Sequence, residues 1–195
     1  MKHFIYGAGG HGKVVLDAMQ AAGLICDGFV DDGEHAVWCN LTVLKWQNLP
    51  KNANLHLAIG NNKTRENISK LLIKFNFFNV IHAHASVAKT AQIQPSCFVA
   101  AQAVLGPDSR LGQCVIVNHG AVIDHDCEVG DFCHIAPNAS LGGGVKVGKN
   151  VLVGAGAVIL PNIKIADNVV IGAGAVVTRD VLTQATLVGI PAKPI

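Results

Sequence analysis

An aliphatic residue recurs at every sixth position through fifteen consecutive hexads, and the position four residues after it is small or β-branched. The aliphatic positions are Val87, Ile93, Val99, Leu105, Leu111, Val117, Ile123, Val129, Ile135, Leu141, Val147, Val153, Ile159, Ile165 and Ile171. A fixed six-residue period is typical of a parallel β-helix, in which three hexads form one coil of a triangular prism. The pattern therefore predicts five coils stacked at the ~4.8 Å spacing of β-strands, with both coupled positions pointing inward.

The composition fits a core of small and β-branched side chains. Of the 195 residues, 50% are hydrophobic but only 5% are aromatic, and 21 are glycine. Charged residues reach only 14%, which suggests that partner subunits cover part of the outer surface. The net charge of +2 offers no argument for binding nucleic acid or a membrane surface.

The cysteines and the apolar runs indicate a cytoplasmic protein. No apolar run approaches the ~20 residues of a membrane-spanning helix, and the first residues lack the long apolar stretch of a signal peptide. We therefore expect the six cysteines to be reduced. None has the C-x-x-C spacing of a metal site, and we expect no metal. Three of them occupy inward hexad positions, where we interpret them as small core residues: Cys97, Cys127 and Cys133.

The first part of the chain, residues 1–84, has a different pattern. Strand-like stretches at residues 3–6, 25–30 and 55–59 alternate with apolar positions at helical spacing, and residues 78–81 form one more possible short strand. Strands separated by helices predict a small parallel α/β sheet, a Rossmann-like half domain. Residues 85–195 then form the β-helix domain with a C-terminal tail.

A glycine turn follows the first strand. Gly7, Gly9 and Gly12 fit the G-x-G-x-x-G pattern, and Asp31 lies about twenty residues later. Such a turn holds a diphosphate at a helix N-terminus, usually that of NAD. Because this domain is too short for a second nucleotide half, we favour UDP. The residues expected at the substrate, at the turn and at strand ends, are Gly9, Gly10, His11, Gly12, Asp31, Asp32, Gly60 and Asn62.

The hexads resemble the [LIV]-G-x-x-[STAV]-x repeat of the left-handed β-helix acyltransferases. Over its whole length the chain resembles the sugar O- and N-acyltransferase family, which includes sialic-acid O-acetyltransferases. The segments that carry the likeness are residues 6–12, 31–32, 60–62, 123–127 and 188–193. The likeness is closest to the bacillosamine-pathway N-acetyltransferases.

This resemblance implies a left-handed β-helix in a homotrimer, with acetyl-CoA bound between neighbouring subunits. It also implies acetyl transfer to the 4-amine of a UDP-linked 4-amino-4,6-dideoxy-N-acetylglucosamine.

Acetyl transfer from a thioester to an amine needs a base and a donor for the oxyanion. His125 is the third residue of its hexad, a position that projects outward, and it lies between Asp124 and Asp126. A carboxylate on one ring nitrogen would leave the other free to accept a proton. The resemblance implies that His125 is the base and Asp126 the residue that orients it. The family usually has Glu there, and since Asp is shorter, Asp124 remains a second candidate.

The remaining site residues are carried over from the family. His134 is expected to contact acetyl-CoA near the thioester, or alternatively to bond across a subunit interface. Gly143 is expected to offer its backbone N–H to the oxyanion or substrate, unless it only forms a tight corner. Asn118 is expected to face the sugar.

Four positions remain for the coenzyme. Ala155 and Ala173 lie one coil apart, and small residues there leave a groove for the pantetheine arm. Lys149 and Lys164 are among the cations that could hold its phosphates.

Three other functions compete with this hypothesis. An O-acetyltransferase of the same family would use the same motifs, because one base serves both nucleophiles. A non-catalytic trimer that binds a nucleotide sugar would not need the His–Asp pair or the groove. A nicotinamide-dependent oxidoreductase is disfavoured by the short α/β domain.

Overall fold

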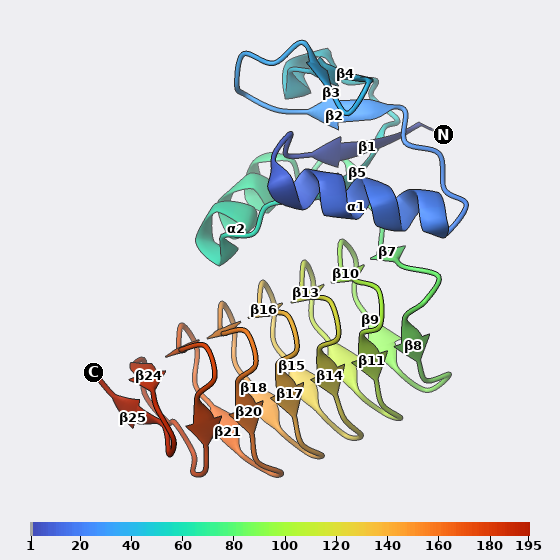
Figure 1. Ribbon diagram of the computed structural model, residues 1–195. Helices are drawn as coiled ribbons and strands as arrows, with labels where there is room; N and C mark the ends of the chain where they lie inside the picture. Colours follow the sequence, from blue (N-terminus) through green and yellow to red (C-terminus); the bar gives the residue numbers. More distant parts are fainter. Residues whose placement is uncertain (1) are drawn as a thin grey trace.

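The computed structural model describes residues 2–195, which form an α/β domain resting on a β-helix (Figure 1). The α/β domain has a six-stranded sheet in the order β3-β4-β2-β1-β5-β6. The strands are β1 (His3–Tyr6), β2 (Gly28–Val30), β3 (Val37–Trp38), β4 (Leu41–Leu44), β5 (Asn54–Leu57) and β6 (Asn76–Phe77). The helices are α1 (Gly10–Ala21) and α2 (Asn62–Leu71), with a 3-10 turn at Trp46–Asn48.

The order of the strands reverses at β1. The chain passes from β1 to β2 on one side and later enters β5 on the other side, with all three strands parallel. Their carboxyl ends therefore meet at a topological switch point, where open α/β sheets bind ligands. The glycine turn, Asp31 and Gly60 all lie just beyond these ends.

Two features differ from the expected strands. A hairpin, β3–β4, was not predicted; its two turn residues, Cys39 and Asn40, have φ of 49° and 61°, as in a type I′ turn. Residues 78–81 do not extend the α/β sheet, because β7 (Val80–Ile81) pairs with β10 of the β-helix. The β-helix thus begins before residue 85, and Ile81 lies six residues before Val87, in phase with the hexads.

The β-helix has three flat faces built from two-residue strands. The docked face contains β7, β10 (Phe98–Val99), β13 (Ile116–Val117), β16 (His134–Ile135), β19 (Leu152–Val153) and β22 (Val170–Ile171), followed by β24 (Thr186–Val188) and β25 (Lys193–Pro194). The uncharged face contains β8 (Ser86–Val87), β11 (Val104–Leu105), β14 (Val122–Ile123), β17 (Ser140–Leu141), β20 (Val158–Ile159) and β23 (Val176–Val177). The charged face contains β9 (Gln92–Ile93), β12 (Arg110–Leu111), β15 (Glu128–Val129), β18 (Lys146–Val147) and β21 (Lys164–Ile165).

Three corners join these faces, and each recurs every eighteen residues. The alanine corner, from the docked to the uncharged face, includes residues 118–121 and 154–157. The histidine corner, from the uncharged to the charged face, includes residues 124–127 and 142–145. The docking corner, from the charged to the docked face, includes residues 112–115 and 130–133. The faces hold eight, six and five strands, so the β-helix extends beyond the five coils that we expected.

Inward residues form a continuous core along the β-helix axis. Cys97, Cys127 and Cys133 are fully buried in it, and burial raises the pKa of the Cys97 and Cys133 thiols to about 12. All six cysteines are free thiols in the described chain. No helix within residues 2–195 is long and apolar enough to cross a membrane.

The two helices pack on opposite faces of the α/β sheet, because Ile5 of β1 belongs to the buried cluster of α1, whereas Phe4 and Tyr6 belong to the cluster at the end of α2; both helices also contact the β-helix (Figure 1). Val15 and Met19 of α1 belong to the same buried cluster as Phe98 and Ile116, which point outward from the docked face. At the docking corner, Cys114 and Phe132 join the buried cluster of Leu72 and Phe75 at the end of α2. The two domains therefore share hydrophobic cores across their junction.

Candidate active site

The glycine turn leaves open space at two of its glycines. A β-carbon on Gly9 or Gly10 would meet no atom within 4 Å, and both residues are exposed. They lie at the N-terminus of α1, where backbone N–H groups and the helix dipole favour a phosphate. Gly12 has another role, because a β-carbon there would collide with the Gly7 carbonyl oxygen. Gly12 therefore lets helix and turn pack closely.

The acidic residues beyond β2 brace the turn. Asp31 Oδ2 accepts a hydrogen bond from the Ala8 N–H at 2.8 Å, and its Oδ1 accepts one from the Gly33 N–H at 2.7 Å. Asp32 Oδ2 accepts a bond from the Tyr6 hydroxyl at 2.8 Å. These contacts hold the ends of β1 and β2 together beside the open glycines.

The His11 side chain points into the junction between the domains. Its ring lies edge-on to the ring of Phe98, with the two centroids 5.2 Å apart. The centroid of the His134 ring lies 6.5 Å from that of His11. Burial lowers the pKa of His11 to about 3, so its imidazole is neutral near pH 7. We therefore expect its backbone, at the start of α1, to serve a phosphate.

A chain of hydrogen bonds crosses the same junction. The His119 N–H donates to Asn118 Oδ1 at 2.9 Å, which leaves Asn118 Nδ2 to donate to His134 Nε2 at 3.1 Å. His134 Nδ1 lies 3.3 Å from the Gly60 carbonyl oxygen, and we assign the ring proton to Nδ1 from this network. Burial, with a smaller effect of the Arg65 charge, lowers the pKa of His134 to about 4. His134 is thus neutral, with both nitrogens occupied.

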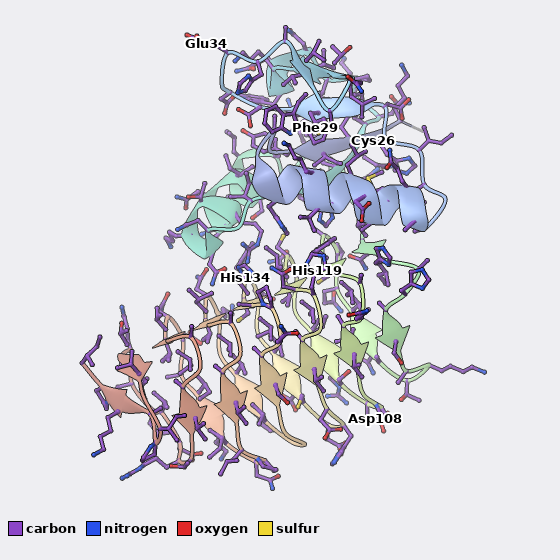
Figure 2. The ribbon with its side chains drawn as sticks, viewed as in Figure 1. Cys26, Phe29, Glu34, Asp108, His119 and His134 are labelled. Atoms are coloured by element: carbon purple, nitrogen blue, oxygen red, sulfur yellow. The ribbon has the colours of Figure 1, made fainter. Side chains whose placement is uncertain are left out.

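An open cavity of about 290 Å³ lies beside these hydrogen bonds. Its lining comes from the loop after β5 and the start of α2, and from the docking corner and docked face of the β-helix: Gly60, Asn61, Asn62, Lys63, Asn150, Leu152, Asn168 and Val170. Asn62 Nδ2 also donates to the Val151 carbonyl at 3.1 Å. Figure 2 shows His119 and His134 between the helices and the β-helix. The structure therefore brings Gly60, Asn62, Asn118 and His134 together.

His125 lies on the histidine corner, with its side chain 59% exposed. Its Nδ1 is 2.8 Å from Asp126 Oδ2, so the shorter acid does reach the ring. Asp124 instead accepts the backbone N–H of His125 at 2.7 Å. The bond to Asp126 and the charge of Asp124 raise the pKa of His125 above its ordinary value. Nε2 remains available to accept a proton.

Gly143 lies directly beneath this ring, one coil further along the chain. A β-carbon on Gly143 would collide with His125 Nε2 and would approach Cε1 to 2.5 Å. Any other residue would therefore displace the imidazole. Gly143 itself is buried.

Within one subunit, the histidine corner lies apart from the junction between the α/β domain and the β-helix. Asp108 precedes Asp126 by one coil on the histidine corner, and Figure 2 shows it on the side of the β-helix away from the α/β domain. The ring contacts of His125 found within residues 2–195 involve Asp126 and Gly143, with none to the α/β domain. His125 and the predicted sugar site are thus on different corners.

The expected coenzyme residues are also divided. Ala155 and Ala173 are exposed on the alanine corner, stacked one coil apart. Lys149 lies on the docking corner, 3.7 Å from Asp131, and Lys164 lies on the charged face. A single chain therefore does not bring these lysines to the groove beside the alanines.

Comparisons with known proteins agree with this fold. Residues 2–72 match the family described as the PglD N-terminal domain, and residues 144–179 match the bacterial transferase hexapeptide family (six repeats). The acetyltransferase domain of PglB from Neisseria gonorrhoeae FA1090 is 34% identical, with a TM-score of 0.95, over 100% of this chain and 99% of that chain. A histidine-to-asparagine variant of perosamine N-acetyltransferase from Caulobacter crescentus, solved with CoA and GDP-perosamine, is 32% identical with a TM-score of 0.94, covering 100% and 97%.

This chain belongs to the hexapeptide-repeat sugar acetyltransferase family. Its β-helix is accordingly of the left-handed type. WeeI from Acinetobacter baumannii AYE, 24% identical with a TM-score of 0.68, shares the fold.

One buried residue of this acetyltransferase was missed in the sequence. Arg65 is fully buried beneath the loop that carries Gly60 and Asn62. It stands in the polar run 61–66, which reads as a solvated helix face. No local pattern signals it, because its partners in the β-helix lie 49 to 68 residues away.

Proposed function

We propose that this acetyltransferase transfers acetyl from acetyl-CoA to the 4-amine of a nucleotide-linked amino sugar, a UDP-4-amino-4,6-dideoxy-N-acetylglucosamine, with His125 as general base. The observation that carries the proposal is the His125 ring. It is exposed, oriented by a carboxylate on Nδ1, and lies against a glycine at Nε2. A base so arranged can take a proton from a nucleophile at the protein surface.

The chemistry follows from these contacts. The sugar amine attacks the thioester carbonyl, and its proton passes to Nε2 of His125. Asp126 stabilises the resulting imidazolium. The N–H of Gly143, which has no acceptor within residues 2–195, stabilises the oxyanion. The tetrahedral intermediate then expels the CoA sulfur, which takes the proton from the imidazolium.

The three faces of the β-helix favour a homotrimer. The α/β domain covers the first strands of the docked face, where Phe98 and Ile116 are buried against it, and the charged face presents Arg110, Glu128, Lys146 and Lys164. The outward residues of the uncharged face are Ser86, Val104, Val122, Ser140, Val158 and Val176. A column without charges is suited to packing against another subunit, and cyclic symmetry would repeat the contact three times.

Trimer formation would also complete the active site. The uncharged face is flanked by the histidine corner on one side and by the alanine corner, next to the junction, on the other. Packing at this face would bring His125 of one subunit towards the sugar site of a neighbour. Acetyl-CoA would lie between the subunits, with its pantetheine arm along Ala155 and Ala173. Lys164 of the neighbouring subunit, on the charged face that adjoins its histidine corner, is then a candidate for the phosphates, whereas Lys149 lies on the corner opposite the uncharged face.

In this proposal the diphosphate of the nucleotide binds at Gly9 and Gly10, and the sugar points towards the junction cavity. The Caulobacter relative was solved with GDP-perosamine, so whether this protein prefers a uracil or a guanine nucleotide must be tested directly. The free thiols of all six cysteines fit a reducing compartment, and we propose the cytoplasm.

A thiol-release assay with acetyl-CoA tests the proposal. The acceptors are UDP- and GDP-linked 4-amino sugars, the matching 4-hydroxy sugars and free sialic acid. We expect release with the UDP-amino sugar and an N-acetylated product by mass spectrometry. Release with hydroxyl acceptors alone would establish O-acetylation, and a preference for the GDP-linked sugar would change the nucleotide. Binding of nucleotide sugar without release from any acceptor would contradict an enzymatic role.

A further inference from the structure

The junction contains a buried cation without an acidic partner. The Arg65 side chain has no solvent exposure, and no carboxylate within residues 2–195 forms an ion pair with it. Burial lowers its pKa to about 10, so it still carries its charge near pH 7. A buried charge is costly unless its donors are satisfied, so its bonding explains how it is tolerated.

Six oxygen atoms surround this guanidinium from two domains. Nε donates to the Cys114 carbonyl at 2.8 Å, and Nη2 donates to the Phe132 and Cys133 carbonyls at 2.8 and 3.1 Å. These three acceptors lie on the docking corner of two successive coils. The other three belong to the loop after β5: Ile59 O at 2.7 Å, Gly60 O at 3.3 Å and Asn62 Oδ1 at 2.9 Å.

The corner residues themselves are unusual. Cys114 and Phe132 have φ of 55° and 60°, in the left-handed region. The next residues in the same column, Asn150 and Asn168, are of the type that usually adopts it. At the first two positions, the side chains pack beneath the α/β domain and the carbonyls face Arg65. This part of the docking corner is therefore built for contact with α2.

The loop held by Arg65 is the one predicted to meet the sugar. Gly60 O accepts from Arg65 and lies against His134 Nδ1, so one carbonyl links the guanidinium to the imidazole. Asn62 Oδ1 accepts a hydrogen bond from Arg65, and Asn62 Nδ2 donates one to the carbonyl oxygen of Val151 in the β-helix. Both amide ends of Asn62 are thereby fixed at the edge of the junction cavity.

We propose that Arg65 is a positioning residue that locks the loop at residues 59–62 onto the β-helix and so sets Gly60, Asn62 and His134 for the nucleotide sugar. This inference rests on the proposed function and names a residue that acts through others. Its positive charge also disfavours protonation of His134. Lysine cannot replace it fully, since an ammonium has three donors and lacks the planar fork that reaches both domains.

The test compares three variants of the full chain. Arg65→Met removes the donors and the charge, Arg65→Lys keeps the charge with fewer donors, and Arg110→Met removes an exposed arginine of the charged face. For each we measure the melting temperature, KM for the nucleotide sugar, KM for acetyl-CoA, and the titration of His134 by imidazole NMR.

We expect KM for the nucleotide sugar to rise about tenfold or more in Arg65→Lys, since small displacements of positioning groups can cost up to ~10²-fold. KM for acetyl-CoA should change little in the same variant. In Arg65→Met the His134 pKa should move up from about 4, whereas Arg65→Lys, which keeps the charge, should retain a low value. Arg110→Met should match wild type in every measurement.

Equal KM values in Arg65→Lys and wild type would overturn the proposal. So would losses in both KM values that merely follow the melting temperature. If Arg65→Met does not fold, Arg65→Lys alone decides the matter through the two KM values. If wild type transfers no acetyl group, the proposed function fails, and calorimetry with the nucleotide sugar plus the NMR titration still test Arg65.

Discussion

Two histidines of the β-helix, His125 and His134, stand in opposite environments. His125 is exposed between two aspartates, and its pKa is raised by the bond to Asp126 and the charge of Asp124. His134 is half-buried at the junction, where burial and the charge of Arg65 lower its pKa to about 4. The first imidazole has a free nitrogen, and the second uses both nitrogens within the protein.

The difference shows how one scaffold produces two kinds of histidine. Hexads on every face have the same inward pattern, so the environment of an outward residue depends on what covers that face. The histidine corner is not covered by its own chain, whereas the docked face lies beneath α1 and α2. This difference supports our proposal that His125 transfers the proton and that His134 has a structural position facing the substrate.

The largest effect should come from His125→Ala. General-base catalysis is typically worth ~10²–10⁴-fold, so kcat should fall within that range while acetyl-CoA binding and the melting temperature stay close to wild type. Steady-state kinetics and calorimetry measure these quantities. His84→Ala, at another exposed histidine, is the control and should retain full activity. A His125→Ala variant with more than about a tenth of wild-type kcat would mean that another group is the base.

Gly143→Ala should come next. The added methyl group would occupy the position of the His125 ring, and a misplaced catalytic group can cost ~10²-fold, so we expect kcat to fall by up to that factor. The double variant with His125→Ala should be no slower than His125→Ala alone if Gly143 acts only through the ring. Because alanine keeps the backbone N–H, a further loss in the double variant would show that the added methyl group also disturbs groups other than the ring, such as the oxyanion position proposed beside this N–H.

Gly9→Val tests the nucleotide end of the junction. A β-carbon at Gly9 meets no protein atom within 4 Å, so we expect folding to be little affected, yet the side chain would fill the space above the turn. We expect UDP binding measured by calorimetry to weaken by about tenfold or more, equivalent to about 1.4 kcal/mol. Gly12→Ala is the contrasting variant, because its methyl group would collide with the Gly7 carbonyl and lower the melting temperature. Tight NAD binding by wild type, without UDP binding, would reverse the assignment.

Asp126→Asn should have the smallest effect on rate and a distinct effect on pH dependence. The base must be neutral, so the wild-type rate should rise with pH, with a midpoint above the ordinary histidine pKa of about 6.5. Removing the carboxylate removes the largest cause of the raised pKa, so the midpoint should move to lower pH. A profile of kcat/KM against pH measures it. Asp124→Asn should shift the midpoint less, and equal shifts would show that the two acids act alike.

Much of the candidate site could be predicted from the sequence. The hexad phase places His125 outward and the three inward cysteines inside, and the structure agrees on each. The glycine turn was recognisable because it follows a strand and opens a helix. The assignment of Asp126 to the ring and Asp124 to the backbone needed coordinates, since both acids adjoin His125 in the chain.

The sequence by itself determined the β-helix, because a six-residue period repeats the same local conformation and inward packing along the chain. It did not determine where the α/β domain rests or what surrounds each outward histidine. Arg65 reaches carbonyl oxygens 49 to 68 residues away, and backbone carbonyls carry no residue-type signature. The tertiary structure alone decided that a helix covers His134 and not His125, and burial with the nearby charges then shifted the pKa values of the two histidines in opposite directions.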